Sequence, residues 1–249
     1  MSWITTLTAD VSEEHRLLDL VRKILIRVLW ISFLVGVGAV SYYQLTRSDV
    51  LPIKQIAFKG EFAQLEVNDM QPIVENVVSG NFFTLNVADL YQRLLALPWV
   101  KQVWIHRVWP DKINVNVQEQ MPIGVLKGRG LINQEGDVFA SSSQIFEEKL
   151  VLFDVAETFE KKAIQYYQQY VDVLRSTGLK IKSYHFNIRN SQSIIFTNGL
   201  ELKLGKQDTK NRMTLFVLAY AKNIGPKVDA IKRLDFRYTN GFAVQWKEL

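Results

Sequence analysis

The sequence predicts an α+β protein with three parts: an N-terminal transmembrane helix, a small module of two helices and three strands, and a mixed α/β domain. The last part has a mostly antiparallel sheet and ends in a C-terminal hairpin. A long uncharged run near the N-terminus, a strand-helix-helix-strand-strand pattern after it, and short strands interrupted by two helical segments predict this class. With 48% hydrophobic and 22% charged residues, the composition indicates folded domains.

The uncharged run covers residues 28–46, between Arg27 and Arg47. At about 1.5 Å per residue a helix of this length approaches the hydrocarbon thickness of ~30 Å. Trp30 and the pair Tyr42 and Tyr43 lie near its two ends, where aromatic rings favour the membrane interface. A buried core helix would carry a polar stripe, which this run lacks. The run is therefore predicted to span a membrane.

Basic residues before the run, Arg22, Lys23 and Arg27, favour a cytoplasmic tail over residues 1–27. The small-x-small sequence Ala39-Val40-Ser41 leaves a cleavable signal peptide as the alternative. An uncleaved anchor is favoured, because both the segment before the run and the run itself are long for a signal peptide.

After the span, the pattern of the small module begins with a strand at 53–58. Apolar residues at helical spacing then predict two helices, one around Met70 to Val78 and one that Asn86 caps and Pro98 ends. Strands at 100–108 and 113–117 flank a turn at Trp109-Pro110-Asp111-Lys112. This order is that of a POTRA domain, a module that binds polypeptides, and we expect it over residues 51–120.

The last part, residues 121–249, shows shorter signals. Gly residues and the hairpin signal Asn198-Gly199 separate its strands. The expected strands are 123–126, 131–133, 138–140, 150–153, 183–188, 194–197 and 200–204. The expected helices are about 157–176 and 208–223, and Asp208 is expected to cap the second one.

The final segment predicts a hairpin around Thr239-Asn240-Gly241. A two-residue loop would place Asp235 and Arg237 on its apolar face. We therefore expect a three-residue loop with Gly241 in the left-handed conformation. The expected pairs are Tyr238 with Phe242, Phe236 with Val244, and Leu234 with Trp246. A last strand at a sheet edge would expose backbone groups that can capture a partner strand.

Several function classes find no support in the residues. The chain has no cysteine, and its three histidines, His15, His106 and His185, have no second ligand at metal-binding spacing, so we expect no metal site. The serines at 141–143 lack a catalytic context, and no glycine run forms a phosphate cradle. The net charge is +5, but the basic residues are spread along the chain, which disfavours nucleic-acid binding. We expect no enzyme activity, cofactor or small-molecule substrate.

Several segments together resemble one known family, FtsQ/DivIB, a family of bacterial cell-division proteins. These segments are Leu97-Pro98-Trp99-Val100-Lys101-Gln102-Val103, Arg107-Val108-Trp109-Pro110-Asp111, Glu119-Gln120-Met121-Pro122-Ile123, Leu202-Lys203-Leu204-Gly205-Lys206, and Leu234-Asp235-Phe236-Arg237-Tyr238 with Asn240-Gly241 and Ala243-Val244-Gln245-Trp246. The chain departs from the family at Leu152-Phe153-Asp154-Val155, where members often have a Leu-Tyr-Gly-Pro turn, and it lacks the polar C-terminal tail of some members.

The resemblance implies a divisome scaffold in the inner membrane at the septum, with a cytoplasmic N-terminus and periplasmic C-terminal domains. It implies binding to FtsB and FtsL by strand addition at the C-terminal hairpin. The partner-binding residues carried over by position are Arg189, Arg237, Tyr238, Asn240, Gly241, Phe242 and Trp246.

Each of these residues also has a plainer interpretation. Tyr238 and Trp246 fit a hairpin core, and Arg189 and Arg237 fit solvated surface. A second partner surface is expected at Gln102, Ile105 and Arg107, on the strand before the Trp-Pro-Asp turn. For Trp99 and Trp109 we expect core packing and turn anchoring rather than ligand contact.

Two other functions compete with this hypothesis. A POTRA-containing envelope chaperone or protein-transport module would carry repeated units or a following barrel, and the chain shows no such repeat. A membrane-anchored envelope enzyme would need a deep pocket with acids of perturbed pKa.

Overall fold

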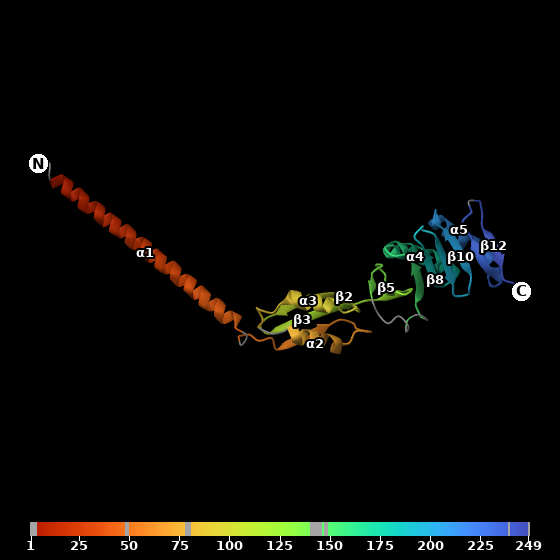
Figure 1. Cartoon of the computed structure of the whole chain (residues 1–249), viewed down its shortest axis with the longest axis horizontal. Helices are drawn as coiled ribbons and strands as arrows, with labels where there is room; N and C mark the ends of the chain where they lie inside the picture. Colours follow the sequence, from red (N-terminus) through yellow and green to blue (C-terminus); the bar gives the residue numbers. More distant parts are fainter. Residues whose placement is uncertain are drawn as a thin grey trace. The chain divides into compact units, whose positions relative to one another are not determined.

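The computed structural model describes residues 4–47, 50–77, 81–139, 146, 149–238 and 240–248. The serines at 141–143, the last residue of the strand expected at 138–140, Val78 and Thr239 therefore lie outside the described residues. The chain forms two compact units (Figure 1). The first contains 1–59, 66–94 and 103–116, and the second contains 60–65, 95–102 and 117–249.

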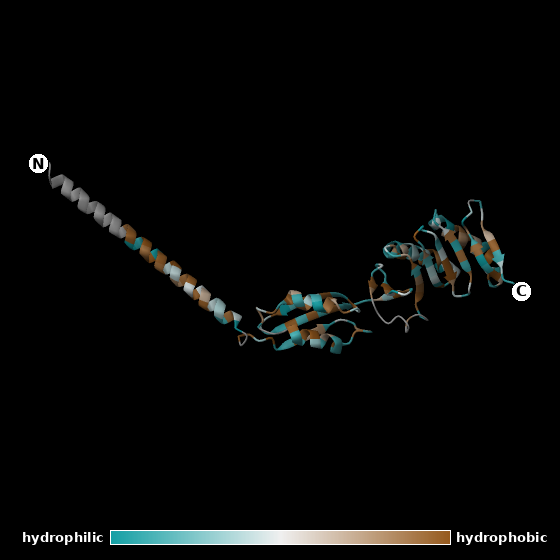
Figure 2. Cartoon of the chain, in the orientation of Figure 1, coloured by the Kyte–Doolittle hydropathy of each residue, from teal (hydrophilic) through white to brown (hydrophobic). Residues whose placement is uncertain are grey.

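The first helix, α1, runs from Ile4 to Thr46. Its segment Leu20–Thr46 has a mean hydropathy of 2.1 and is not buried, so it is long and apolar enough to cross a membrane. Figure 2 shows hydrophobic residues along this segment. The predicted span at 28–46 lies inside it, and the helix continues N-terminally into the region expected as a tail.

The small module has the predicted strand-helix-helix-strand-strand order, and its sheet order is β1-β3-β2. Its elements are β1 (Gln55–Lys59), α2 (Val67–Val77), α3 (Val87–Leu95), β2 (Val100–Val108) and β3 (Lys112–Glu119). β1 and β3 are parallel. The Asn86 side chain caps α3 as expected, because its Oδ1 accepts the Asp89 N–H at 3.1 Å. Met70, Leu90 and Ile113 are fully buried.

The larger domain contains a nine-stranded sheet in the order β12-β11-β10-β9-β8-β7-β4-β5-β6. The strands are β4 (Pro122–Leu126), β5 (Gly130–Asn133), β6 (Val138–Phe139), β7 (Val151–Val155), β8 (Ile181–Phe186), β9 (Gln192–Phe196), β10 (Glu201–Gly205), β11 (Ile231–Asp235) and β12 (Ala243–Trp246). Only β4–β7, β7–β8 and β10–β11 pair in parallel, which confirms a mostly antiparallel sheet. The segment at 152–155 belongs to β7, so it is a strand rather than the family's turn.

Two helices, α4 (Glu160–Leu174) and α5 (Thr209–Ala219), share one buried core with the sheet. Tyr170 of α4 and Phe216 of α5 are buried in it, and Phe216 stacks on Phe196 of β9 at 5.8 Å between ring centroids. Elsewhere the sheet carries charged side chains, such as Glu201, whose Oε2 binds Arg233 Nε at 2.6 Å. The apolar side chains of these strands therefore alternate with polar ones, as the sheet period requires.

The helix expected from Asp208 to about Asn223 is only partly regular. α5 ends at Ala219, a π-helical turn covers Tyr220–Ile224, and a 3₁₀ turn covers Gly225–Ala230. Asp208 precedes the helix but does not cap it, because its backbone is left-handed (φ 49°) and its Oδ1 accepts the Asn211 side-chain amide instead. The expectation that Asp208 caps the helix was therefore wrong.

The predicted register of the C-terminal hairpin is also wrong. Leu234 pairs with Val244, and Ile231 rather than Leu234 pairs with Trp246. Phe236 does not pair with Val244, whose partner is Leu234, and the Phe236 N–H donates to the Lys203 carbonyl of β10 at 2.8 Å. The connection therefore spans 236–242, and Gly241 has φ +156°, outside the left-handed helical region.

An irregularity in β11 keeps the apolar face intact despite this register. The pairing shifts between Ile231 and Arg233, so that Ile231 and Leu234 are both buried. Phe242 stacks on Phe236 at 4.6 Å with an interplanar angle of 11°. The expectation that these apolar side chains gather together holds, although their partners differ.

The two conspicuous tryptophans of the small module differ. Trp99 packs against Phe139 and Phe146, with ring centroids 5.4 and 5.8 Å apart, as expected of a core residue. Trp109 lies in the turn between β2 and β3, where turn anchoring was expected, and its side chain is 73% exposed, so it does not pack in a core.

One buried polar side chain joins helix and sheet in the larger domain. Gln192 Oε1 accepts the hydroxyl protons of Tyr170 at 2.6 Å and Tyr184 at 2.8 Å. Burial raises the pKa of both phenols, so they stay neutral donors. The single carbonyl of Gln192 thus satisfies two buried hydroxyls, each of which would otherwise carry a desolvation penalty.

We predict that Gln192→Leu lowers the free energy of unfolding by about 2–4 kcal/mol, because it removes the carbonyl that accepts hydrogen bonds from two buried hydroxyls. Tyr184→Phe removes only one donor and should cost about 1 kcal/mol. Urea unfolding of the detergent-solubilised chain, followed by near-UV circular dichroism, measures both. Equal losses for the two variants would contradict this account.

Candidate partner-binding site

The strand β12 forms an open edge of the large sheet. β11 is its one neighbour among the described strands, and all four residues of β12 are exposed. The Lys247 N–H donates inward to the Ala230 carbonyl at 2.8 Å. Because antiparallel strands alternate their bonding directions, the N–H and C=O of Val244 and Trp246 point away from β11. These backbone groups can bind a further strand.

Exposed aromatic side chains lie along and beside this edge. Tyr238 is 59% exposed and Trp246 is 53% exposed, so neither forms a hairpin core. Phe242 is held more firmly, because it stacks on Phe236, whose ring meets Phe216 edge-on at 5.9 Å. The edge thus combines one anchored ring with two that project into solvent.

Arg237 is more than solvated surface. Its backbone N–H and Nε donate to Asp235 Oδ1 at 3.0 and 2.9 Å, and its Nη2 donates to Oδ2 at 2.6 Å. These hydrogen bonds lower the pKa of the Asp235 carboxyl, although its burial opposes the shift. The side chain of Arg237 is 55% exposed, so its guanidinium can still meet a partner's acceptor through Nη1.

Sequence reasoning missed a residue that fixes the hairpin, Arg212 of α5. Its Nη1 donates to the Leu204 carbonyl at 2.6 Å, and its Nη2 donates to the Arg237 carbonyl at 3.0 Å. Gly205 lies beneath both arginines with φ +74°, and a Cβ there would come within 3.0 Å of Arg212 Nη1 and of Arg237 Cγ. The Leu-x-Leu-Gly run therefore ends in glycine for a steric reason.

Arg189 lies away from the edge strand but at the same end of the sheet. It is exposed in the β8–β9 turn, where its N–H donates to Asn187 Oδ1 at 2.9 Å. Gln192 pairs with Gly205, and Lys203 pairs with Asp235, so this turn and the 236–242 connection end at the same side. At ~4.8 Å per strand, Arg189 is roughly 15–20 Å from β12.

The 236–242 connection and α5 enclose a groove of about 540 Å³. Leu215 and Leu218 of α5 line it with exposed fractions of 56% and 53%. Tyr238, Asn240 and Gly241 line it from the connection. Of the carried-over residues, Tyr238, Asn240, Gly241 and Phe242 line this groove, and Arg237 precedes Tyr238 in the chain. Trp246 lies at the other end of β12, opposite Ile231, and Arg189 is set apart in the β8–β9 turn.

The second expected surface is less coherent. Gln102 is exposed on β2, Ile105 is half-buried, and Arg107 donates through Nη2 to the Leu85 carbonyl at 2.9 Å. Because side chains alternate along a strand, Gln102 faces the opposite way from Ile105 and Arg107. The three residues therefore do not share a face of β2.

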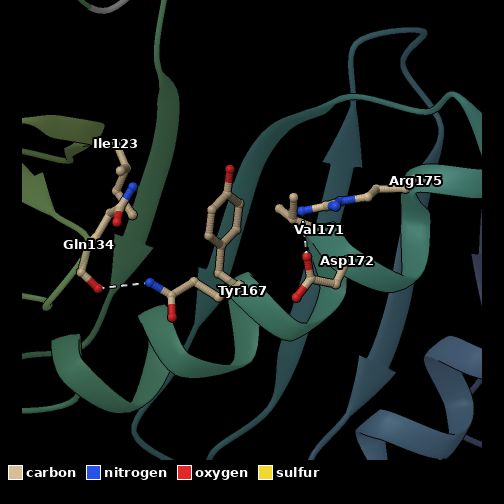
Figure 3. Close-up of a pocket in the computed structure, with 7 residues that line it drawn as sticks. Ile123, Gln134, Tyr167, Val171, Asp172 and Arg175 are labelled. Atoms are coloured by element: carbon tan, nitrogen blue, oxygen red, sulfur yellow. Dashed lines mark hydrogen bonds and ion pairs between the residues drawn. The ribbon is translucent and has the colours of Figure 1, made fainter.

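A hollow beside α4 contains no arrangement of reactive groups (Figure 3). Gln168 Nε2 donates to the Gln134 carbonyl at 2.8 Å, and Asp172 pairs with Arg175 at 2.9 Å. Burial raises the pKa of Tyr167, which also lines the hollow. Within the described ranges, no group of three His, Cys, Asp or Glu side chains could hold a metal ion.

Comparisons with known proteins extend over most of the chain. A family model described as the FtsQ-type POTRA domain matches residues 51–120, and one described as the C-terminal part of the cell division protein FtsQ/DivIB matches residues 124–237. The cell division protein FtsQ of Coxiella burnetii is 28% identical over 237 residues, with 94% of this chain and 96% of the relative covered. The FtsQ proteins of Shewanella oneidensis and Aliivibrio fischeri are 31% and 30% identical and cover 86% and 82% of this chain, which spans 81% and 79% of theirs.

We predict that Asp235→Asn lowers the free energy of unfolding by about 1–3 kcal/mol at pH 7, because it weakens charge-assisted hydrogen bonds to Arg237. The folded state lowers the pKa of Asp235 below its ordinary value of 3.8. The carboxylate therefore stabilises the fold fully above this value, and the contribution is lost as the pH falls through the folded-state pKa. The difference between wild type and variant should shrink at pH 3 in urea unfolding.

The matched control is Asp172→Asn, since the Asp172 side chain is 67% exposed in its pair with Arg175. An exposed ion pair contributes little, so this change should cost under about 0.5 kcal/mol at either pH. A loss at Asp235 that stays constant from pH 7 to pH 3 would contradict the prediction.

Proposed function

The chain belongs to the FtsQ/DivIB family of bacterial cell-division proteins, and from this premise we propose that it is a divisome scaffold that binds FtsB and FtsL by strand addition at β12. Members of this family are non-enzymatic cell-division proteins. The single observation that carries the proposal is the open edge of the sheet at β12, with exposed aromatic side chains beside it.

The proposed location is the inner membrane at the division septum, with residues 1–27 cytoplasmic, residues 28–46 in the bilayer, and residues 51–120 and 121–249 as periplasmic domains. The apolar segment of α1 supports a single-pass membrane protein. Arg22, Lys23 and Arg27 support the cytoplasmic N-terminus. The FtsQ-type POTRA match supports a polypeptide-binding module next to the membrane.

The proposed mechanism divides affinity from selectivity. The outward N–H and C=O groups of Val244 and Trp246 bond the backbone of the added strand and supply affinity that does not depend on its side chains. Tyr238, Phe242 and Trp246 then select apolar side chains on that strand. Because the connection is already held by Arg212 and Asp235, binding orders little further chain.

Charge provides a second level of selection. Arg237 offers Nη1 beside the edge, and Arg189 offers an exposed guanidinium at the same end of the sheet. A partner that adds to β12 and then crosses this end would meet both cations, so we expect it to carry carboxylates there. Asn240 and Gly241 lie at the exposed connection, where such a partner would pass. The surface at Gln102, Ile105 and Arg107 stays a prediction for a different partner.

We predict that Val244→Pro abolishes binding to the FtsB–FtsL complex, because proline removes an outward N–H without removing an N–H that bonds β11. Val244→Ala shortens the same side chain, keeps the N–H, and should weaken binding less than about fivefold. Titration of the complex onto the detergent-solubilised chain measures affinity, and circular dichroism checks the fold. A folded Val244→Pro variant that binds as tightly as Val244→Ala would rule out strand addition.

We predict further that Trp246→Ala weakens the same binding by about 10- to 30-fold, as expected when a desolvated aromatic anchor is truncated. Trp104→Ala is the matched control, because Trp104 is 42% exposed on β2, which is not part of the nine-stranded sheet. Its affinity should stay within about twofold of wild type. Equal losses for the two variants would argue against a contact at Trp246.

A further inference from the structure

The small module brings three chain segments to the end where β1 begins. β1 and β3 are parallel with Gln55 opposite Lys112, so the turn before β3 lies at the start of β1. The Lys54 N–H donates to the Asp111 carbonyl at 2.9 Å, and Lys54 Nζ lies 3.6 Å from Asp111 Oδ2. The turn at 109–111 is thus fixed beside the chain that arrives from α1.

A buried asparagine holds the end of α1 at the same place. Asn81 is fully buried, and its Nδ2 donates to the carbonyls of Leu45 at 2.5 Å and Arg47 at 2.8 Å. Its Oδ1 accepts the backbone N–H groups of Phe83 and Thr84 at 2.9 Å. Carbonyls at the C-terminal end of a helix lack partners within the helix, and Asn81 supplies donors for two of the carbonyls here.

This end of the module exposes apolar side chains. Trp109 is 73% exposed, Phe83 is 47% exposed and Val108 is 38% exposed. Phe83 follows Asn81 by two residues, so its backbone lies within about 7 Å of a group that binds the last turn of α1. If α1 spans a bilayer, these side chains lie at the depth where Trp and Phe partition favourably.

Cations surround the apolar side chains. The Lys54 side chain is 68% exposed, Arg107 is exposed and Lys112 is half-buried. Three carboxylates lie on neighbouring elements: Asp111, which pairs with Lys54; Glu75 near the end of α2, which accepts the Gln71 amide at 2.8 Å; and Asp89 in the first turn of α3, which pairs with Arg93 at 3.0 Å. Exposed aromatic rings with an excess of cations fit an anionic lipid surface.

We propose that this end of the module, formed by Phe83, Val108 and Trp109 with Lys54 and Arg107, is seated in the headgroup region of the bilayer that α1 spans. Trp109 and Phe83 enter the boundary between headgroups and acyl chains, and the two cations lie against lipid phosphates. Asn81 keeps the end at this depth because it ties the module to the last turn of α1. The proposal depends on α1 spanning the membrane and is independent of partner binding at β12.

The test uses a single label, because the chain contains no cysteine. The full chain with Val108→Cys, labelled with an environment-sensitive fluorophore, is reconstituted alone into nanodiscs that contain phosphatidylglycerol. Lipids with a nitroxide high on the acyl chain should quench this label by at least half. The control label is at Lys59→Cys, at the far end of β1 and about 13 Å along the strand from Gln55. Its fluorescence should fall by less than a tenth. Weak and equal quenching at both positions would overturn the proposal.

A second measurement tests the named side chains. Trp109→Ser should reduce the quenching at Val108→Cys at least twofold. Trp104→Ser should leave the quenching unchanged, because Trp104 lies on β2 four residues before Val108 and so farther from the turn. Replacing phosphatidylglycerol with phosphatidylcholine should also reduce the quenching at Val108→Cys about twofold. The proposal fails if the two tryptophan variants behave alike, and the role of the cations fails if lipid charge has no effect.

Discussion

The unpaired outer side of β12 is the constraint on which the rest of the larger domain depends. A strand with free N–H and C=O groups pairs readily with other chains, so a protein that keeps one must hold it in a defined shape. Here the strand is short, its side chains are exposed, and its connection to β11 is fixed from two directions. These contacts hold the edge in a defined shape, which is what the proposed addition of one strand requires.

The side chains that hold the 236–242 connection bond to backbone atoms more than to other side chains. Arg212 reaches from α5 to two carbonyls, one on β10 and one at Arg237. Asp235 holds both the backbone and the guanidinium of Arg237. Gly205 leaves room for both arginines. A partner would thus meet a guanidinium whose direction is already set, which lowers the entropy lost on binding.

Sequence patterns predicted the parts of the fold that depend on local periodicity. The apolar run of α1, the cap of α3 by Asn86 and the alternation in the strands are all local, and the structure contains them. The family resemblance pointed to the C-terminal end, where most of the carried-over residues lie together. These features need no knowledge of distant contacts.

The features that sequence reasoning missed depend on contacts between residues far apart in the chain. The hairpin register differs from the expected one because pairing with β12 ends at Asp235 and because β11 contains an irregularity between Ile231 and Arg233. Arg212 was missed because its acceptors are main-chain carbonyls, which carry no sequence signal. The sequence placed Trp109 in a turn but did not show that its ring is 73% exposed, because size and hydrophobicity alone do not say which apolar residues stay exposed.

The different binding roles proposed for Trp109 and Trp246 rest on their surroundings rather than on residue type. Both are more than half exposed. Trp246 belongs to a strand with unsatisfied backbone groups, which only another polypeptide can complete in register. Trp109 sits in a turn rather than in a strand, and the Lys54 and Gln55 N–H groups bond the Asp111 carbonyl of the same turn. The Trp109 ring lies among cations near the end of the apolar helix α1. A lipid headgroup layer can accommodate both the ring and the cations, and it requires no strand register.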